Sequence, residues 1–311
     1  MIKSGTHRKN ILVIQARPGI GDMCVFLPCI KEIGKKYSNY DLHILTKKRS
    51  YGKDFLKYDK CIKKIFYLPE EAGIKLNYSI LKFIRQNKYQ KCFIMHYSLR
   101  YYFLSLLANV KKIYFYGFFK KKESIVYRSQ KSTKQWLKNE SLVFEPKIFY
   151  KNNIQKIDQI TFGIGGSGFN KKWDIEKYIQ LAELINKQKK FNILLAGGPE
   201  EINNAKYISQ KLNSLKISTS SICEKKICDC IDYLVQSKIY IGNDTGFMHL
   251  SGCLGIRSYG LFGDTPPDYA SYNKNIFAIT PNGSSKITHG SGMMDKIKAD
   301  YVFDQISTHI C

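Results

Sequence analysis

The sequence predicts an α/β protein of two domains, each with a parallel β-sheet and helices on both faces. Short apolar runs alternate with longer amphipathic segments along most of the chain, which is the pattern of repeated strand–helix–strand units. The alternation lapses over residues 118–150, and 311 residues correspond to about two domains. We therefore place the domains at residues 1–150 and 151–311, with the linker in Glu145–Lys156.

In the first half, five apolar runs are predicted as strands: Asn10–Ile14, Leu42–Leu45, Lys64–Tyr67, Cys92–His96 and Ile113–Tyr116. The amphipathic segments between them predict helices at Asp22–Tyr37, Ile74–Gln86 and Leu99–Asn109. Pro28 lies inside the first helix and predicts a kink or a short first turn. Residues 118–150 carry many lysines among aromatic side chains and predict no clear element.

In the second half, the predicted strands are Ile160–Ile164, Asn192–Ala196, Ile239–Ile241 and Ser258–Phe262. The predicted helices are Ile175–Gln188, Glu200–Lys211, Ile231–Val235 and Gly246–Leu254. Two such Rossmann-like halves joined by a linker predict a ligand-binding cleft between them. The C-terminal helix is expected to pack in the second domain or back on the first.

The composition favours certain classes of binding partner but does not identify one of them. Lys and Arg total 50 against 25 Asp and Glu, a net charge of +25 that suits nucleic acid, an anionic membrane surface or a phosphorylated substrate. An AT-rich genome would also accumulate lysine on solvated faces. No apolar run approaches the ~20 residues of a membrane span, and Ile11–Ile14 is too short for a signal-peptide core, so we expect a cytoplasmic protein.

Cysteines and acidic residues do not form a convincing metal site. The one cysteine cluster, at Cys223, Cys228 and Cys230, lacks a second ligand pair, and no Asp-x-Asp metal motif stands out. Reduced, partly buried thiols are the expectation.

The first chemical motif is a glycine loop between the first strand and the first helix. It contains Gly19 and Gly21 and ends at Asp22. Backbone N–H groups at such a helix start face whatever ligand lies above it. The third glycine of a dinucleotide fingerprint is replaced by Cys24, and the Walker lysine is missing. Asp22 is either a simple N-cap or a carboxylate able to accept a proton from a hydroxyl.

The second motif is another strand–loop–helix segment, Gly163–Trp173. Gly165, Gly166 and Ser167 permit close backbone approach, and Lys171 can supply a positive charge to a phosphate. A flexible loop is the alternative interpretation, with Trp173 as a packing residue.

The third motif, Gly242–His249, is the most specific. Asp244, Thr245 and Gly246 lie where a helix N-terminus presents free N–H groups to an anion, and His249 follows one turn later. Nearby, Glu200 or Glu201 could accept hydrogen bonds from a ribose or merely favour the helix dipole. The segment Gly263–Asp268 predicts a rigid loop at the same sheet edge.

These motifs, in this order, resemble glycosyltransferase family 9, the ADP-heptose:lipopolysaccharide heptosyltransferase family. The resemblance runs from about Asn10 to Asp268 and rests on Gly19–Asp22, Gly163–Trp173, Gly197–Glu200 and Gly242–His249. It implies a GT-B fold, in which two Rossmann-like domains face each other across a cleft. The N-terminal domain would bind the acceptor and the C-terminal domain the nucleotide-sugar.

The resemblance also implies roles for single residues. Asp22 would be the general base, and Lys171 would hold the donor diphosphate. Asp244, Thr245 and Gly246 would contact the donor, His249 would support them, and Glu200 or Glu201 would meet the ribose. The implied donor is ADP-heptose and the acceptor an anionic, lipid-linked lipopolysaccharide-core or other bacterial surface glycan, met at the inner face of the membrane. No cofactor or obligatory divalent metal is implied.

Several alternatives stay open. The chain could be a catalytically idle homologue that binds sugar-nucleotides or glycans, or a family member that uses another nucleotide-sugar. An NAD-dependent oxidoreductase is disfavoured by Cys24, and a nucleic-acid binder by the lack of any known motif. Under the glycosyltransferase hypothesis, Lys120, Lys121 and Lys122 become candidates for a weak membrane anchor.

Overall fold

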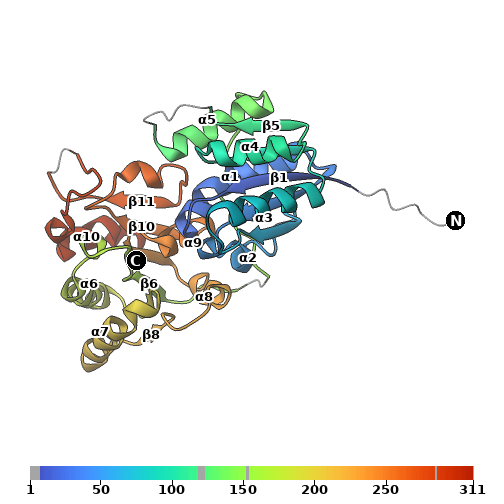
Figure 1. The fold of residues 1–311 in the computed structure, drawn as a ribbon. Coiled ribbons are helices and arrows are strands. Elements are labelled where there is room, and N and C mark those ends of the chain that lie inside the picture. The colour runs from blue at the N-terminus through green and yellow to red at the C-terminus, as the bar shows by residue number, and fades with distance from the viewer. Residues whose placement is uncertain (1–7, 118–122, 152–153, 284–285, 311) are drawn as a thin grey trace. The chain divides into compact units, whose positions relative to one another are not determined.

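The fold is described from a computed structural model, for residues 8–117, 123–151, 154–283 and 286–310. Two compact units divide the chain at residues 145 and 146 (Figure 1). Each unit has one parallel sheet. Lys120, Lys121 and Lys122 fall outside the described residues.

The first unit has a five-stranded sheet in the order β3-β2-β1-β4-β5. Its strands are β1 (Lys9–Gln15), β2 (Tyr40–Thr46), β3 (Lys64–Tyr67), β4 (Lys91–Ile94) and β5 (Lys112–Phe115). Its helices are α1 (Ile20–Lys36), α2 (Gly52–Phe55), α3 (Gly73–Gln86), α4 (Leu99–Leu107) and α5 (Ile125–Leu137). Every strand pair is parallel, so each connection crosses the sheet through a helix.

Helices cover both faces of this first sheet. α1 packs against α5, and α3 packs against α4. The side chains of α3 and α4 that face the sheet form one core with β1 and β4, and this core includes Ile84, Leu104 and Ile14. α1 is one continuous helix through Pro28, and its first turn starts two residues earlier than the sequence predicts.

The second unit has a six-stranded sheet in the order β11-β10-β9-β6-β7-β8. Its strands are β6 (Gln159–Gly163), β7 (Asn192–Ala196), β8 (Thr219–Ser221), β9 (Ile239–Asn243), β10 (Arg257–Leu261) and β11 (Ile276–Ile279). Its helices are α6 (Ile175–Gln188), α7 (Ile202–Ser214), α8 (Ile227–Leu234), α9 (Gly246–Cys253) and α10 (Ala299–Ile306). The prediction of two Rossmann-like α/β units is confirmed.

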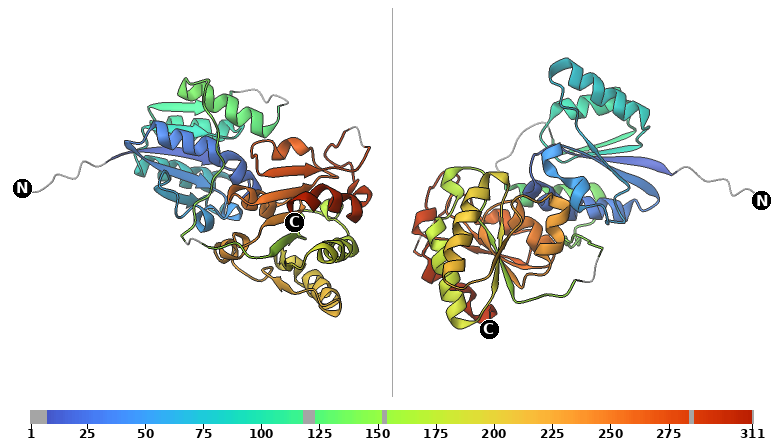
Figure 2. Two further views of the ribbon diagram at one scale, coloured as in Figure 1. Left: turned by 180° about the vertical axis from the view of Figure 1, so that it is seen from behind. Right: turned by 90° about the horizontal axis from the view of Figure 1, so that it is seen from below.

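The C-terminal helix belongs to the second unit. α10 packs against α6, and α6 packs against α7, so these three helices share one face of the sheet (Figure 2). Val302 and Ile306 are fully buried in the same core as Ile185 of α6. The sequence also allowed this helix to pack back on the first unit. In the structure, the apolar face of α10 is covered by α6 within the second unit.

Some elements were not predicted from sequence. They are α5, the short α2, β8 and β11. None of the helices in the described part of the chain is long and apolar enough to cross a membrane.

Candidate active site

The strand orders of both sheets create a place where ligands bind in open α/β folds. In the second unit, β6 lies between β7 and β9. The connection after β6 leads to β7 on one side of this position, and the connection after β9 leads to β10 on the other side. A crevice forms outside the carboxyl ends of strands at such a switch point. The loops that follow β6 and β9 carry the second and third sequence motifs, which the sheet therefore brings together.

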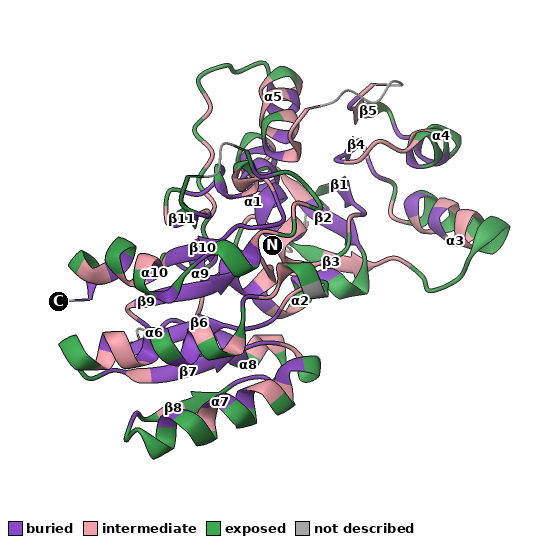
Figure 3. Cartoon of the chain, turned by 90° about the vertical axis from the view of Figure 1, so that its left-hand side faces the viewer, coloured by how far each residue is buried: buried purple, intermediate pink, exposed green. Residues whose placement is uncertain are grey.

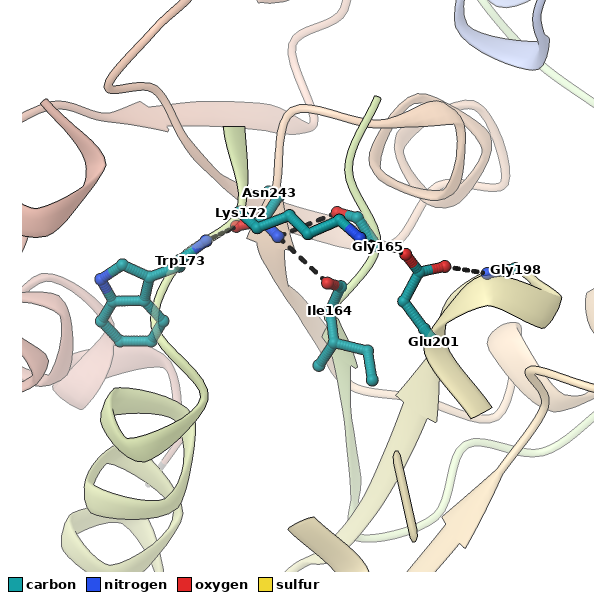
Figure 4. Close-up of polar contacts among 7 residues, drawn as sticks. All are labelled: Ile164, Gly165, Lys172, Trp173, Gly198, Glu201 and Asn243. Carbon is teal, nitrogen blue, oxygen red and sulfur yellow. Dashed lines mark hydrogen bonds and ion pairs between the residues drawn. The ribbon is translucent and has the colours of Figure 1, made fainter. Parts of the chain in front are cut away.

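Asn243 at the end of β9 ties these two loops to each other (Figure 4). Its Nδ2 donates to the carbonyl oxygens of Ile164 at 3.3 Å and Gly165 at 2.8 Å. Its Oδ1 accepts from the backbone N–H of Trp173 at 3.0 Å and from the hydroxyl of Tyr178 at 3.2 Å. The side chain is fully buried, so these bonds fix both ends of the glycine loop relative to β9.

Replacing Asn243 with Ala is expected to destabilise the second unit. The change leaves buried polar groups of the loop without partners, at a cost of about 1–3 kcal/mol for each group that water cannot reach. Urea denaturation should show a loss of at least about 2 kcal/mol. A free energy of unfolding equal to that of the wild type would contradict this role of Asn243.

Glycines bring the carboxyl ends of β6 and β9 into close contact. Gly163 pairs with Gly242 in the parallel ladder. A Cβ on Gly242 would lie 2.4 Å from the carbonyl oxygen of Gly163, and a Cβ on Gly163 would lie 1.7 Å from the hydroxyl of Tyr240. No larger residue fits at either position without displacing the strands.

Asp244 and His249 form a buried pair at the start of α9. The distance from Asp244 Oδ1 to His249 Nε2 is 3.4 Å, and the side chains are 12% and 6% exposed. His249 Nδ1 lies 2.9 Å from the hydroxyl of Tyr272, whose ring stacks on the imidazole. Tyr272 therefore fixes the orientation of His249, and His249 fixes the orientation of Asp244.

The surroundings of Asp244 favour its ionised form. Burial on its own raises the pKa of Asp244, but His249 and the charge of Lys171 together hold this pKa below its usual value. Lys171 is half-buried and lies in the loop before α6. The structure thus brings Lys171, Asp244 and His249 together, as the sequence motifs predict.

The lowered pKa of Asp244 predicts how stability depends on pH. A carboxyl group with a lowered pKa stabilises the folded state at pH values above its unfolded pKa of about 3.9, and this contribution disappears as pH falls through the folded pKa. The stability difference between the wild type and Asp244→Asn should therefore shrink as pH is lowered from about 5 towards 3. Urea denaturation at a series of pH values measures it, and a difference independent of pH would refute the assignment.

The N-terminus of α9 presents unused polar groups. The first backbone N–H groups of a helix have no partner within it. Thr245 is the N-cap residue in extended conformation, and its Oγ1, like that of Thr265, is buried without a hydrogen-bond partner in the described residues. Gly246 begins the helix and adds no side chain. Positive helix-end charge and two unsatisfied hydroxyl groups thus lie around Asp244.

The structure distinguishes between Glu200 and Glu201. Glu201 is buried, and its carboxylate accepts from Lys172 Nζ at 2.8 Å and from the backbone N–H of Gly198 at 2.8 Å. It links the loop after β7 to the loop after β6 (Figure 4). Glu200 is exposed at the same turn, which leaves its carboxylate accessible to a ligand.

The remaining loop residues lie as their motifs suggest. Gly165, Gly166 and Ser167 follow β6. Trp173 is buried, and its indole N–H donates a hydrogen bond to the carbonyl oxygen of Ile297 at 2.8 Å. Asp264, in the loop after β10, accepts from the backbone N–H of Gly292 at 2.7 Å.

In the first unit, Asp22 is not an N-cap. The N-cap of α1 is Gly19, with φ at 104°, a backbone conformation that favours glycine. Asp22 lies in the first turn together with Gly21, and its Oδ1 accepts from Arg17 Nε at 2.7 Å. Its side chain is 20% exposed. The N-cap interpretation is therefore wrong, and a partly exposed, ion-paired carboxylate follows β1 at the carboxyl edge of this sheet.

The sequence motifs include Arg17 and Lys172 but assign no role to either, and they do not include Tyr272. Each is a common residue type whose importance depends on its partner in space. Among the described residues, no group of three His, Cys, Asp or Glu side chains could hold a metal ion.

Comparisons with known proteins agree with this geometry. Residues 149–292 match the sequence model of glycosyltransferase family 9 (heptosyltransferase). Solved structures with similar folds include an E. coli ADP-heptose lipopolysaccharide heptosyltransferase II, at 17% identity and a TM-score of 0.75 over 97% of this chain and 98% of that one. An E. coli heptosyltransferase solved with ADP has 14% identity and a TM-score of 0.76 over 96% and 99%.

A family 9 glycosyltransferase from Veillonella parvula has 14% identity and a TM-score of 0.72 over 97% of both chains. No curated protein sequence matches the chain. At these identities the structures establish the GT-B type of fold, and the family match covers the loops that hold Lys171, Asp244 and His249. Residues 149–292 are thus similar to glycosyltransferase family 9 (heptosyltransferase), and the whole chain shares the fold of the two E. coli heptosyltransferases.

Proposed function

We propose that this enzyme is an inverting transferase that moves heptose from ADP-heptose onto a lipopolysaccharide-core or other bacterial surface-glycan acceptor. The observation that carries the proposal is the set of unsatisfied polar groups at the start of α9, beside Lys171. A helix N-terminus and a lysine together are suited to a diphosphate. E. coli heptosyltransferases solved with ADP and with ADP-2-deoxy-2-fluoro heptose share the fold.

In the proposed donor site, Lys171 and the N–H groups of Gly246 and its neighbours hold the diphosphate. The hydroxyl groups of Thr245 and Thr265 donate to phosphate or sugar oxygens, which satisfies groups that are otherwise buried and unpaired. Asp244, kept ionised and oriented by His249, accepts hydrogen bonds from hydroxyl groups of the donor sugar. Glu200 accepts from the ribose.

In the proposed reaction, Asp22 accepts the proton of the acceptor hydroxyl. The hydroxyl oxygen then forms a bond to the anomeric carbon as the bond between that carbon and the diphosphate oxygen breaks. The bonding electron pair leaves with ADP, and the positive groups around α9 stabilise its charge. Arg17 holds the Asp22 carboxylate in one orientation through its 2.7 Å contact.

The same positive groups provide the charge that a divalent metal would otherwise supply to the leaving diphosphate. We therefore propose that no divalent metal is obligatory. A cytoplasmic location and contact with the inner face of an anionic membrane remain predictions, which the lipid-linked nature of the proposed acceptor makes reasonable.

The donor assignment is tested by thermal-shift measurements with ADP-, GDP-, UDP- and dTDP-sugars. A ligand that binds only the folded protein raises the melting temperature, so ADP-heptose should give the largest increase. Lys171→Ala should reduce the increase in melting temperature given by ADP-heptose. The control is Lys187→Ala in the last turn of α6, which should leave this increase unchanged. If the sugar of another nucleotide raised the melting temperature clearly more than ADP-heptose, the proposal that ADP-heptose is the donor would be overturned.

A further inference from the structure

We propose that the outer face of α3 and α4 is a docking surface for an anionic lipid membrane. The proposal concerns the first unit alone and does not depend on which sugar the enzyme transfers. It rests on exposed apolar side chains, on the local charge, and on the position of the two helices at the sheet.

Both helices are apolar on the face that points away from the sheet. Six large apolar or aromatic side chains are exposed there: Ile74 by 86%, Tyr78 by 66%, Leu99 by 46%, Phe103 by 49%, Leu106 by 52% and Leu107 by 56%. The opposite face is used for packing, where Ile80, Ile84 and Leu104 are buried. Figure 3 draws the exposed residues of both helices in green. The core therefore does not explain this second apolar face.

Helices α3 and α4 carry only basic charged residues, although the Glu71 carboxylate accepts a hydrogen bond from the Ser79 hydroxyl on α3. No acidic residue occurs between Glu71 and Glu123 in the sequence. Exposed basic residues accompany the apolar ones: Lys75, Lys82, Arg85, Arg100 and Lys111. Exposed apolar side chains among basic ones are typical of helices that lie in a membrane interface, where each Lys or Arg near anionic lipid contributes about 1 kcal/mol.

The charge also argues against a second copy of the chain as the occupant. A two-fold contact through this face would place the five basic residues of one copy opposite those of the other, with more positive charge than the Glu71 carboxylates could neutralise. An anionic bilayer satisfies both the apolar and the basic groups. We therefore commit to the membrane.

The topology places the first turns of both helices at the same edge of the sheet as Asp22, the proposed general base. α3 follows β3 and α4 follows β4, so both helices begin at the carboxyl edge of the sheet. Ile74 and Leu99 lie in these first turns, and Asp22 follows β1 at the same edge. A membrane docked on α3 and α4 would bring a lipid-linked substrate to the edge that carries Asp22.

The test is co-sedimentation with vesicles of phosphatidylcholine alone and of phosphatidylcholine mixed with phosphatidylglycerol. The wild type should bind the mixed vesicles more strongly, and added salt should weaken this binding. Two triple variants, Ile74→Ser/Phe103→Ser/Leu107→Ser and Lys75→Gln/Lys82→Gln/Arg100→Gln, should each bind at least about tenfold more weakly. Every altered side chain is exposed, and circular dichroism checks that the variants are folded.

The matched control lies in the second unit, on α7. Tyr207 is 40% exposed there, between Lys206 and Lys211. The triple variant Lys206→Gln/Tyr207→Ser/Lys211→Gln should bind mixed vesicles like the wild type. The proposal is overturned if the wild type does not bind, if binding ignores lipid charge and salt, or if the α7 variant loses as much. Dimerisation that the apolar α3–α4 variant abolishes, without vesicle binding, would instead assign the surface to a second copy.

Discussion

Replacing Asp22 with Asn is expected to reduce sugar transfer at least about 100-fold, the usual loss when a general base is removed. The amide keeps the shape of the side chain but cannot accept the proton of the acceptor hydroxyl. Donor binding should persist, because the groups proposed to hold the diphosphate lie in the second unit. Transfer is measured as ADP released from ADP-heptose with a heptose-free lipopolysaccharide-core acceptor, and donor binding by thermal shift.

The control for Asp22→Asn is Asp54→Asn. Asp54 is also an acidic residue in the first turn of a helix of the first unit, α2. The control should transfer sugar like the wild type. Near-normal turnover of Asp22→Asn would remove Asp22 from its proposed role. A wild-type protein that binds ADP-heptose but transfers nothing to any lipopolysaccharide-core acceptor would support the idle-homologue alternative.

The regular parts of the fold were predictable because their burial follows a simple period. The strands Lys64–Tyr67 and Asn192–Ala196 and the helix Ile175–Gln188 have the predicted bounds. Strands of a sheet covered on both faces are apolar runs, and helices that pack on one side are amphipathic. Both patterns involve residues close together in the chain, so they can be recognised from the sequence alone.

Helix α5 was missed because its buried face is not apolar. Ser129, Ser132 and Thr133 are buried there beside Val126 and Leu137. Ser129 Oγ donates to the carbonyl of Val126 at 2.9 Å, and Thr133 Oγ1 to that of Ser129 at 2.8 Å. Because these hydroxyl groups are satisfied within the helix itself, they can be buried at little cost, and a pattern of apolar residues does not detect them.

The candidate site was only partly predictable. The loops that hold Lys171, Asp244 and His249 have a recognisable spacing, because a strand–turn–helix unit constrains its own residues. The contacts of Asn243 and Lys172 join segments far apart in the sequence, and their geometry depends on which strands are neighbours. The choice between Glu200 and Glu201 likewise required the position of Lys172.

Replacing Gly242 with Ala is expected to destabilise the second unit strongly. The new Cβ would lie 2.4 Å from the carbonyl oxygen of Gly163 and 2.6 Å from its Cα and N. These are backbone atoms of a paired strand, so they cannot rotate away as a side chain does. Overpacking costs about 1–3 kcal/mol and occasionally more, and a backbone clash belongs at the upper end. We expect about 3 kcal/mol by urea denaturation.

Gly52→Ala is the matched control for Gly242→Ala. A Cβ on Gly52 would meet its nearest atoms at 3.6 Å, an ordinary contact, so stability should change by less than about 1 kcal/mol. Any Gly242→Ala protein that stays folded should also bind ADP-heptose more weakly, because separation of β6 and β9 displaces Asn243 and with it both loops of the proposed donor site. Wild-type stability together with wild-type donor binding would show that the contact of Gly163 and Gly242 does not position this site.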